Sequence, residues 1–196
     1  MRRKTFDMLA TAGGAVLTIV LIAAGSLGLW AHSYANSNVH DQLAMQQITF
    51  PALGSQELAS PKIGPYLNKY AGQPLLTGQQ AEAYADHFIA VHLSEMPYNG
   101  VYSAVSTASR ANPNNATLKA EVQTVFQGTT LRGLLLEAYA FWTMGQIALV
   151  AAIVSFILAA VMALLTLFGV WHFRRTPEDT EFPSSLHHEV KVPAGV

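Results

Sequence analysis

Two long apolar runs interrupt an otherwise mixed pattern of hydrophobic and polar positions. The first extends from Met8 to Trp30 and the second from Ile147 to Val170, and neither contains an ionisable side chain. Each exceeds the roughly 20 residues that a helix needs to cross the hydrocarbon core of a bilayer. We therefore predict transmembrane helices at 8–30 and 147–170. Burial of either run inside a globular protein is the alternative.

The residues that flank these runs predict a direction. Trp30, Trp142 and Trp171 lie at or beside their ends, as aromatic side chains do at membrane–water interfaces. Basic residues precede the first run and follow the second, and such residues favour the cytoplasmic side. They are Arg2, Arg3, Lys4, Arg174 and Arg175. We predict a cell-membrane protein with a cytoplasmic N-terminus at 1–7, an extracytoplasmic domain at 31–146 and a cytoplasmic tail at 171–196.

The first run could also be read as a signal peptide, and the tail has a composition of its own. The small residues at Ser33–Ala35 resemble a signal-peptidase site, so the first run could be a cleaved signal peptide. Hydrophobic regions of signal peptides are usually about 7–15 residues long, which favours an uncleaved anchor here. The tail at 171–196 is polar and contains proline, a composition typical of disorder.

The segment between the runs has a helical pattern. No Gly or Pro occurs between Ala31 and Gln47, so the first helix is expected to continue toward Pro51. Residues 50–65 are rich in Gly and Pro and predict a loop, followed by one or two helical turns. Thr77 and Gln80 form a T-x-x-Q capping box that begins a helix reaching about Glu95. Further helices are predicted at 101–110 and 116–127, and the last is expected to run from 129 into the second span. The predicted fold is all-α, with two transmembrane helices extending into a small helical extracytoplasmic domain.

Small residues recur along both apolar runs at spacings of three or four. In the second run they are Ala148, Ala152, Ser155, Ala159 and Ala163, and the pairs Ala10/Gly14 and Ala24/Gly28 repeat the pattern in the first. Small side chains on one face let helix backbones approach closely in lipid. The stripes predict helix packing, within one chain or between chains, although alanine is also simply common in membrane helices.

Heights along the two helices predict one tertiary contact. Asp41 lies 11 residues beyond Trp30, and Arg132 lies 10 residues before Trp142. At 1.5 Å per residue, both would stand about 15 Å above the same level. We predict an Asp41–Arg132 ion pair, or one made by His40, between the two helices. Placement of both residues on the open surface is the alternative.

Composition excludes several classes of protein. Hydrophobic residues make up 51% of the 196-residue chain and charged residues 12%, about half the charge of an ordinary soluble domain. The net charge of −1 provides no basic surface for nucleic acid. The absence of cysteine excludes disulfides, thiolate nucleophiles and cysteine-bound metal.

Two histidines and two acids in the helix at 77–95 are the candidates for chemistry. His87 and His92 are five residues apart and so face different directions, whereas a helical zinc pair needs a spacing of four. His92 falls on the apolar stripe and is expected to be a core or capped residue. Glu82 and Asp86 share a face, where paired acids are usually solvated. We therefore expect no metal and no cofactor, and the alternative is a site assembled from these residues with His40 and Asp41 across helices.

Three stretches resemble a group of actinobacterial two-span membrane proteins without an established function. They are "MRRKTFDMLATAGG", "IGPYLNKYAGQPLLTGQQAEAYADHFIAVHL" and "VQTVFQGTTLRGLLLEAYAFWTMGQIAL", and together they cover a third to a half of the chain. Some members of that group carry the label aromatic ring-opening dioxygenase. Such an enzyme would hold Fe(II) with two histidines and a carboxylate, and no spacing here supports that set. The resemblance implies topology and lineage, and it supplies no catalytic residues.

These observations predict a non-enzymatic accessory or assembly subunit that presents a helical ectodomain to an envelope partner. Its expected partners are the lipid bilayer and either another membrane protein or a second copy of the chain. A membrane-anchored enzyme or metal-binding protein that uses the histidines and acids is the alternative. Transport is disfavoured, because neither span contains a charge that could form an ion path.

Overall fold

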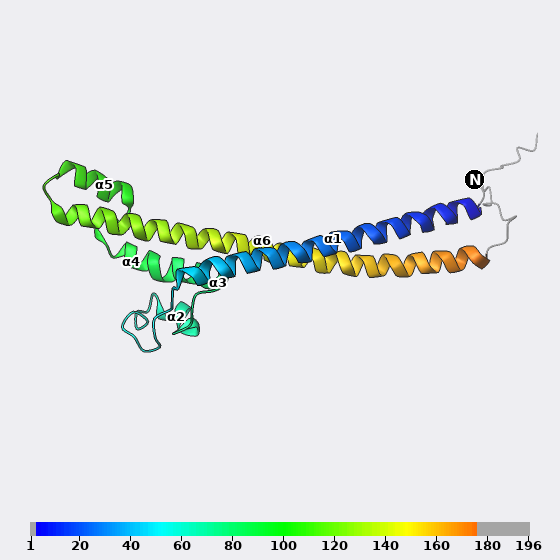
Figure 1. The fold of residues 1–196 in the computed structure, drawn as a ribbon, viewed down its shortest axis with the longest axis horizontal. Coiled ribbons are helices and arrows are strands. Elements are labelled where there is room, and N and C mark those ends of the chain that lie inside the picture. The colour runs from blue at the N-terminus through cyan, green and yellow to red at the C-terminus, as the bar shows by residue number, and fades with distance from the viewer. Residues whose placement is uncertain (1–2, 176–196) are drawn as a thin grey trace, which may run out of the picture. The chain divides into compact units, whose positions relative to one another are not determined.

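The computed structural model describes residues 3–175, which form two compact units. One unit, the helix pair, comprises residues 3–27 and 151–175, and the other, the helical domain, is Gly28–Val150. The described residues contain an isolated β-bridge between Thr49 and Pro74 but no β-strand. The prediction of an all-α fold is confirmed (Figure 1).

Six α-helices and three tighter or wider turns make up the described chain. The α-helices are α1 (Arg3–Gln46), α2 (Gly64–Leu67), α3 (Gly78–Tyr84), α4 (Ala90–Ser94), α5 (Tyr102–Ala111) and α6 (Ala116–Arg175). Two 3₁₀ turns, η1 (Asn68–Tyr70) and η3 (Pro97–Gly100), and a π-helical turn, η2 (Ala85–Ile89), lie between them. As predicted, α1 continues past the first apolar run. In contrast to the predicted break at Gly128, α6 passes through that glycine without interruption. Of the tail predicted to be disordered, residues 171–175 belong to α6 and the rest lies outside the described residues.

Local capping explains where several helices begin. The Thr77 hydroxyl accepts a hydrogen bond from the Gln80 backbone N–H, and the Gln80 side chain accepts one from the Thr77 backbone N–H. The predicted capping box is therefore confirmed. Asn115 caps α6 in the same way, because its Oδ1 accepts from the Leu118 N–H at 3.1 Å. The run α3–η2–α4 ends just before Pro97, as the sequence predicts.

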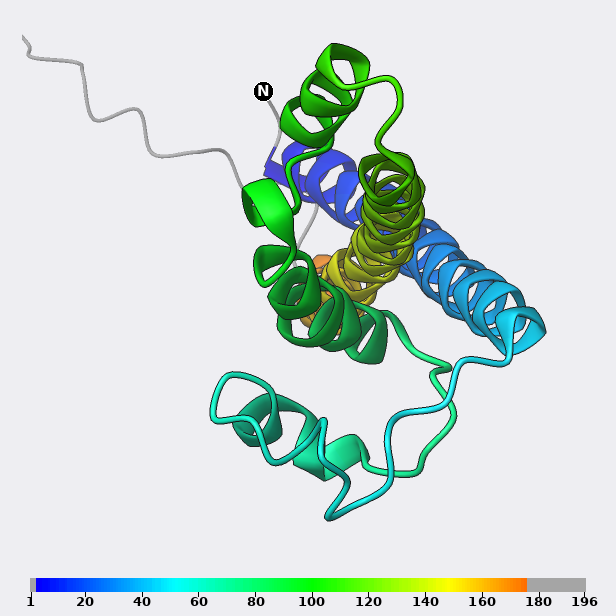
Figure 2. The same ribbon diagram turned by 90° about the vertical axis from the view of Figure 1, so that its left-hand side faces the viewer.

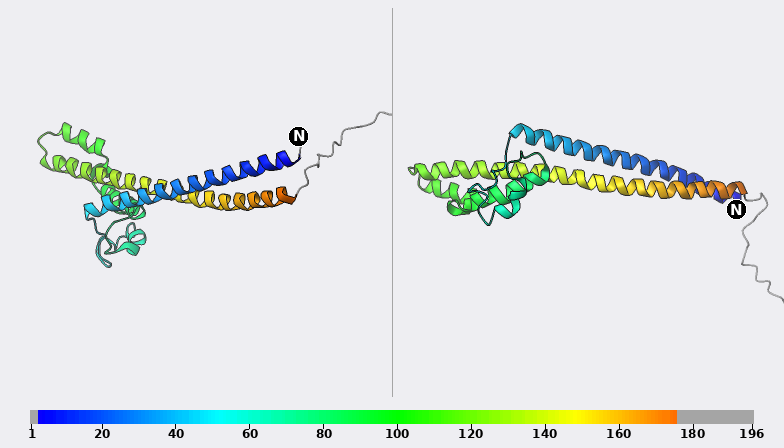
Figure 3. Two further views of the ribbon diagram at one scale, coloured as in Figure 1. Left: turned by 45° about the vertical axis from the view of Figure 1, so that its right-hand side comes forward. Right: turned by 90° about the horizontal axis from the view of Figure 1, so that it is seen from below.

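The helix pair is held by complementary faces on the two helices. Gly14 lies against Thr166, Gly25 against Phe156, and Thr11 against Gly169, so the two segments run antiparallel (Figure 3). The inward residues of α1 recur alternately every three and four positions, a period of 3.5 that is typical of coiled-coil packing. They are Asp7, Thr11, Gly14, Thr18, Leu21 and Gly25. Both the small-residue face of α6 and this face of α1 are thus covered within one chain.

The stripe predicted for the first run is partly wrong. Gly14 and Gly28 are half-buried, but Ala10 and Ala24 are exposed. The stripe of α6 is as predicted, with Ala152 and Ala159 buried and Ala148, Ser155 and Ala163 half-buried. The error came from pairing residues at spacings of four alone, whereas the true face alternates between three and four.

The helical domain has one hydrophobic core. Val39 and Leu43 from α1, Leu135 from α6 and Phe50 from the loop are almost completely buried. The remaining core residues come from the loop, α2 and the run α3–η2–α4: Leu58, Ile63, Leu67, Leu75, Ala81, Ala85 and Ile89. After α1 the chain passes through the loop and α2 and returns as α3, which lies beside α6 (Figure 2). The domain therefore folds around its own core.

The two long helices have little cover over their most apolar stretches. Within those 18-residue windows, only 6% of residues in α1 and 11% in α6 are buried. Both helices are long and apolar enough to cross a membrane. A core helix of a soluble protein would be mostly buried by its own chain, so these faces need lipid or other helices as their environment.

Candidate functional site

Asp86, His87 and His92, which the sequence suggested as site residues, each make a separate contact. Asp86 accepts a hydrogen bond from Arg132 Nη2 at 2.6 Å. The ring of His87 stacks on Tyr66, with ring centroids 3.6 Å apart and planes 2° from parallel. His92 contacts Phe88, and its Nδ1 donates to the Phe88 carbonyl at 2.8 Å. Within residues 3–175, no three His, Asp or Glu side chains converge on a position that could hold a metal ion.

A π-helical turn changes the directions of the residues that follow it. The Ala90 N–H donates to the Ala85 carbonyl, five residues back, so the turn holds one more residue than an α-helical turn. Residues beyond it are rotated relative to a regular helix. Asp86, within the turn, pairs with Arg132 of α6 rather than sharing a solvated face with Glu82, which corrects the sequence prediction. His92 is exposed, so the expectation of a core position was wrong, while its hydrogen bond to the helix backbone agrees with the capped alternative.

The predicted Asp41–Arg132 ion pair is also wrong. Within the described chain, Arg132 forms an ion pair only with Asp86. The carboxylate of Asp41 instead lies 3.2 Å from Nδ1 of the neighbouring His40. Asp41 is two residues from each of the buried residues Val39 and Leu43, about 200° around the helix from both. The prediction compared only the distances of Asp41 and Arg132 along their helices. It failed because the face of α1 that carries Asp41 is turned to solvent.

A chain of hydrogen bonds between α1 and α6 was not predicted. The Gly145 carbonyl accepts from His32 Nδ1 at 3.0 Å, and because a carbonyl can only accept, Nδ1 carries the proton. Asn36 Nδ2 then donates to His32 Nε2 at 3.1 Å, and the Asn36 carbonyl oxygen faces Gln146 Nε2 at 3.5 Å. All three side chains are half-buried. The ring of His32 thus joins the two helices directly through Nδ1, and through Nε2 by way of Asn36.

A sequence signal for this polar chain did exist. His32 and Val39 occupy positions seven residues apart on the inward face of α1, which places a histidine where a core residue would be expected. Asn36 follows His32 by four residues, on the same face of the helix. A register that alternated threes and fours would have identified His32 as an interhelical polar residue, and Asn36 would then follow from its spacing of four to His32.

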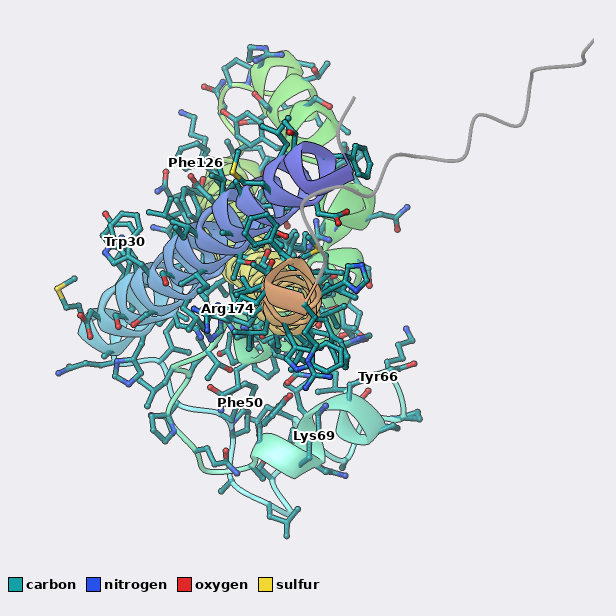
Figure 4. All side chains as sticks on the ribbon, turned by 90° about the vertical axis from the view of Figure 1, so that its right-hand side faces the viewer. Trp30, Phe50, Tyr66, Lys69, Phe126 and Arg174 are labelled. Carbon is teal, nitrogen blue, oxygen red and sulfur yellow. The ribbon has the colours of Figure 1, made fainter. Side chains whose placement is uncertain are left out.

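Gly145 and Gly78 set how closely the helices of the domain approach. A Cβ at position 145 would lie 3.0 Å from the Cβ of Ala35, and one at position 78 would overlap the Cβ and Cγ of Trp142. Trp142 is therefore a packing residue of the domain, and it contacts the core. Trp30 and Trp171 differ from it in being exposed, and Trp30 points outward from its helix in Figure 4. The ring of Trp30 stacks on Tyr34, and the ring of Trp171 lies beneath the Arg175 guanidinium.

A groove runs between α1 and α6 in the helical domain. Its first part is a hollow of about 520 Å³ between residues 31–38 and 141–148, and its second is a hollow of about 330 Å³ between residues 38–46 and 134–141. Asn38 and Phe141 line both hollows, so the two adjoin. We call the first the apolar hollow and the second the polar hollow, and together they form the interhelical groove.

Burial and hydrogen bonding displace the pKa values of Tyr84 and Glu57 in the helical domain. Burial raises the pKa of the Tyr84 phenol above its usual value, which keeps it protonated. A backbone hydrogen bond, assisted by the Ser55 hydroxyl and the nearby His92, lowers the pKa of the exposed Glu57. Both shifts move the group away from neutrality, so neither residue is prepared for proton transfer near pH 7.

Comparison with protein-family models, with curated proteins and with solved structures finds no match. The resemblance to the actinobacterial membrane proteins is untouched by this result and stays a prediction. Function therefore has to be inferred from the chain's own residues.

Proposed function

We propose that the protein is an integral membrane protein whose two apolar helices anchor the helical domain outside the cytoplasm. There the domain acts as a non-enzymatic accessory or assembly subunit that is displayed to an envelope partner. The observation that carries this proposal is the exposure of the apolar stretches of α1 and α6, of which only 6% and 11% is buried. Lipid is the solvent that such faces require.

The distribution of basic residues supports the proposed direction. Arg174 and Arg175 close α6 and are exposed, and Arg175 lies 4.2 Å from the ring of Trp171. This arrangement fits an aromatic residue at the interface followed by cations in the aqueous phase. The basic residues before the first span favour the same side for the N-terminus by the same rule.

An exposed apolar surface at α5 and α6 supports a protein partner. Tyr102 and Phe126 contact each other with ring centroids 5.7 Å apart, and both are about half exposed. Tyr98 and Val101, close by in the chain, are equally exposed. Exposed clusters of aromatic side chains are typical of interaction surfaces.

The alternative of a metal-binding protein or enzyme gains no support from the candidates. Asp86 is held by Arg132, and His87 is stacked against Tyr66. Metal analysis of the purified full chain tests this alternative directly. One iron or zinc ion per chain would favour it over the accessory-subunit proposal.

Labelling of single cysteines tests the topology, because the chain has no cysteine of its own. Ser37→Cys in α1 and Thr107→Cys in α5 introduce thiols at exposed positions of the helical domain. In intact cells both should react with a membrane-impermeant maleimide, whereas Thr5→Cys should react only after permeabilisation. The opposite pattern, or release of the protein from membranes by alkaline carbonate, would overturn the proposal.

Photocrosslinking in living cells tests the display function. A photoreactive residue at Phe126 should give one adduct of defined mass, and Tyr102→Glu should abolish it. The matched control is a photoreactive residue at Leu53, which is 75% exposed in the loop. Equal adducts from both positions, or none from Phe126, would contradict the existence of a partner at this surface.

A further inference from the structure

We propose that the interhelical groove binds one membrane lipid with an uncharged, polyhydroxyl headgroup. This inference rests on the proposed function, because it takes the apolar runs to lie in a membrane. The two hollows, of about 520 and 330 Å³, are within the size range of small-molecule sites. They adjoin through Asn38 and Phe141 and can therefore hold two parts of one molecule.

The polarity of the groove changes along its length. The apolar hollow is bordered by Ala31, Ala35, Met144 and Ala148, and its α1 residues directly follow the first apolar run. The polar hollow is further along α1, away from that run. This order matches an amphiphile whose acyl chain leaves the bilayer at the apolar hollow and whose headgroup lies in the polar hollow.

The side chains of the polar hollow determine the class of headgroup. They include three carboxamides and one carboxylate, those of Asn38, Gln42, Gln46 and Glu137, and no Lys, Arg or His. Carboxamides both donate and accept hydrogen bonds, which suits hydroxyl groups, and a carboxylate accepts from them. An anionic phosphate headgroup would face Glu137 without any cation in the lining. A sugar headgroup satisfies this lining and a phosphodiester does not.

Two of these side chains have polar atoms available to a ligand. Gln42 Nε2 donates to Asn38 Oδ1, so that pair is joined and ordered. The side chains of Gln46 and Glu137 have no hydrogen-bond partner within residues 3–175. Phe141, 55% exposed at the junction of the hollows, offers an aromatic face to the junction of headgroup and chain.

Native mass spectrometry of the full chain in mild detergent tests the proposal. The probes are monoglucosyl diacylglycerol, phosphatidylglycerol and phosphatidylethanolamine with identical acyl chains. The wild-type chain should retain one glucosyl lipid, and at least about five-fold more of it than of either phospholipid, as the loss of one or two hydrogen bonds would predict. Glu137→Lys should reverse the preference toward phosphatidylglycerol.

Matched variants separate binding from folding. Gln46→Ala and Phe141→Ala should each reduce retention of the glucosyl lipid by about five-fold. Gln123→Ala changes an exposed carboxamide of α6 that lies outside the groove and should leave retention unchanged. Helicity measured by circular dichroism should be equal in all three.

Three results would overturn the lipid proposal. They are preferential retention of phosphatidylglycerol by the wild type, equal retention by Gln46→Ala and Gln123→Ala, and a lipid-free dimer in which a second copy covers the groove. Because the measurement is made in detergent, it does not depend on topology. A topology different from the proposed one would be revealed by cysteine labelling and not by lipid retention.

Discussion

Gly78 packs directly against the side chain of Trp142, with no space for a Cβ between them. This contact joins the first turn of α3 to α6 and seats the run α3–η2–α4 beside that helix. It depends on a glycine at the position that follows the Thr77 cap. The contribution of this contact to stability can be measured by replacing Gly78 with alanine and comparing the effect with that of the same substitution at a glycine without such a neighbour.

Gly78→Ala should lower the free energy of unfolding by about 1–3 kcal/mol, because the new methyl group overlaps the Cβ and Cγ of Trp142 and the backbone has to shift. Gly133→Ala is the matched control, since nothing lies within 4 Å of a Cβ at that helical position. It should raise stability by about 0.5–1 kcal/mol. Thermal unfolding in detergent followed by circular dichroism measures both, and equal effects would contradict the packing.

The Asp86–Arg132 ion pair should give a measurable coupling energy. Asp86→Asn and Arg132→Gln should each cost about 1 kcal/mol, and the double variant should show a coupling of about 0.5–1 kcal/mol, since the pair is about a third exposed and partly screened. Chemical denaturation measures the three values. The comparison is a cycle with Asp41→Asn in place of Asp86→Asn, which should show no coupling. Coupling of Arg132 to Asp41 alone would restore the pairing predicted from the sequence.

Loss of the imidazole of His32 should weaken the contact between α1 and α6. His32→Leu removes both ring nitrogens and leaves the Asn36 amide and the Gly145 carbonyl without this partner, at a cost of about 1 kcal/mol. Ser33→Ala, at the exposed neighbouring position, should change stability by less than about 0.5 kcal/mol. Hydrogen exchange of the amides at 31–38 provides a second readout, and it should accelerate only in the His32 variant.

A disulfide should form between positions 11 and 169. The Cβ of Thr11 lies 3.6 Å from the position of a Cβ at Gly169, within the range that disulfides require. Oxidation of the Thr11→Cys/Gly169→Cys variant should therefore give a crosslinked monomer on non-reducing gels. Gly13→Cys/Gly169→Cys should not, because Gly13 has no neighbour within 4 Å of its Cβ position. Crosslinked dimers from the first variant would mean that the small-residue faces join different chains.

The sequence was sufficient to predict the features that depend on local pattern. The lengths of the apolar runs, the capping box at Thr77 and Gln80, and the helix end before Pro97 all follow from neighbours along the chain. The inward face of α1 was misjudged at Ala10 and Ala24, because a spacing of four drifts around the helix where the true register alternates.

Tertiary contacts were less predictable. Asp86 meets Arg132 because the core places its helix beside α6, and the spacing of charges along the chain does not show this. The groove likewise depends on the approach of two helices, α1 and α6, that are separated by the chain between Gln46 and Ala116. Its lining residues look like ordinary surface positions when each helix is considered alone.

The extra residue in the turn Ala85–Ile89 makes the direction of the following residues depend on the number of residues in the turn rather than on their identity. Removal of one residue there would restore a regular α-helix with every backbone hydrogen bond intact, and it would turn Leu93 away from its seat against Gly128 by about 100°. The segment after the turn therefore has one register with the extra residue and another without it. A single codon deletion or insertion, more than any point substitution, is the change that would move the chain from one register to the other.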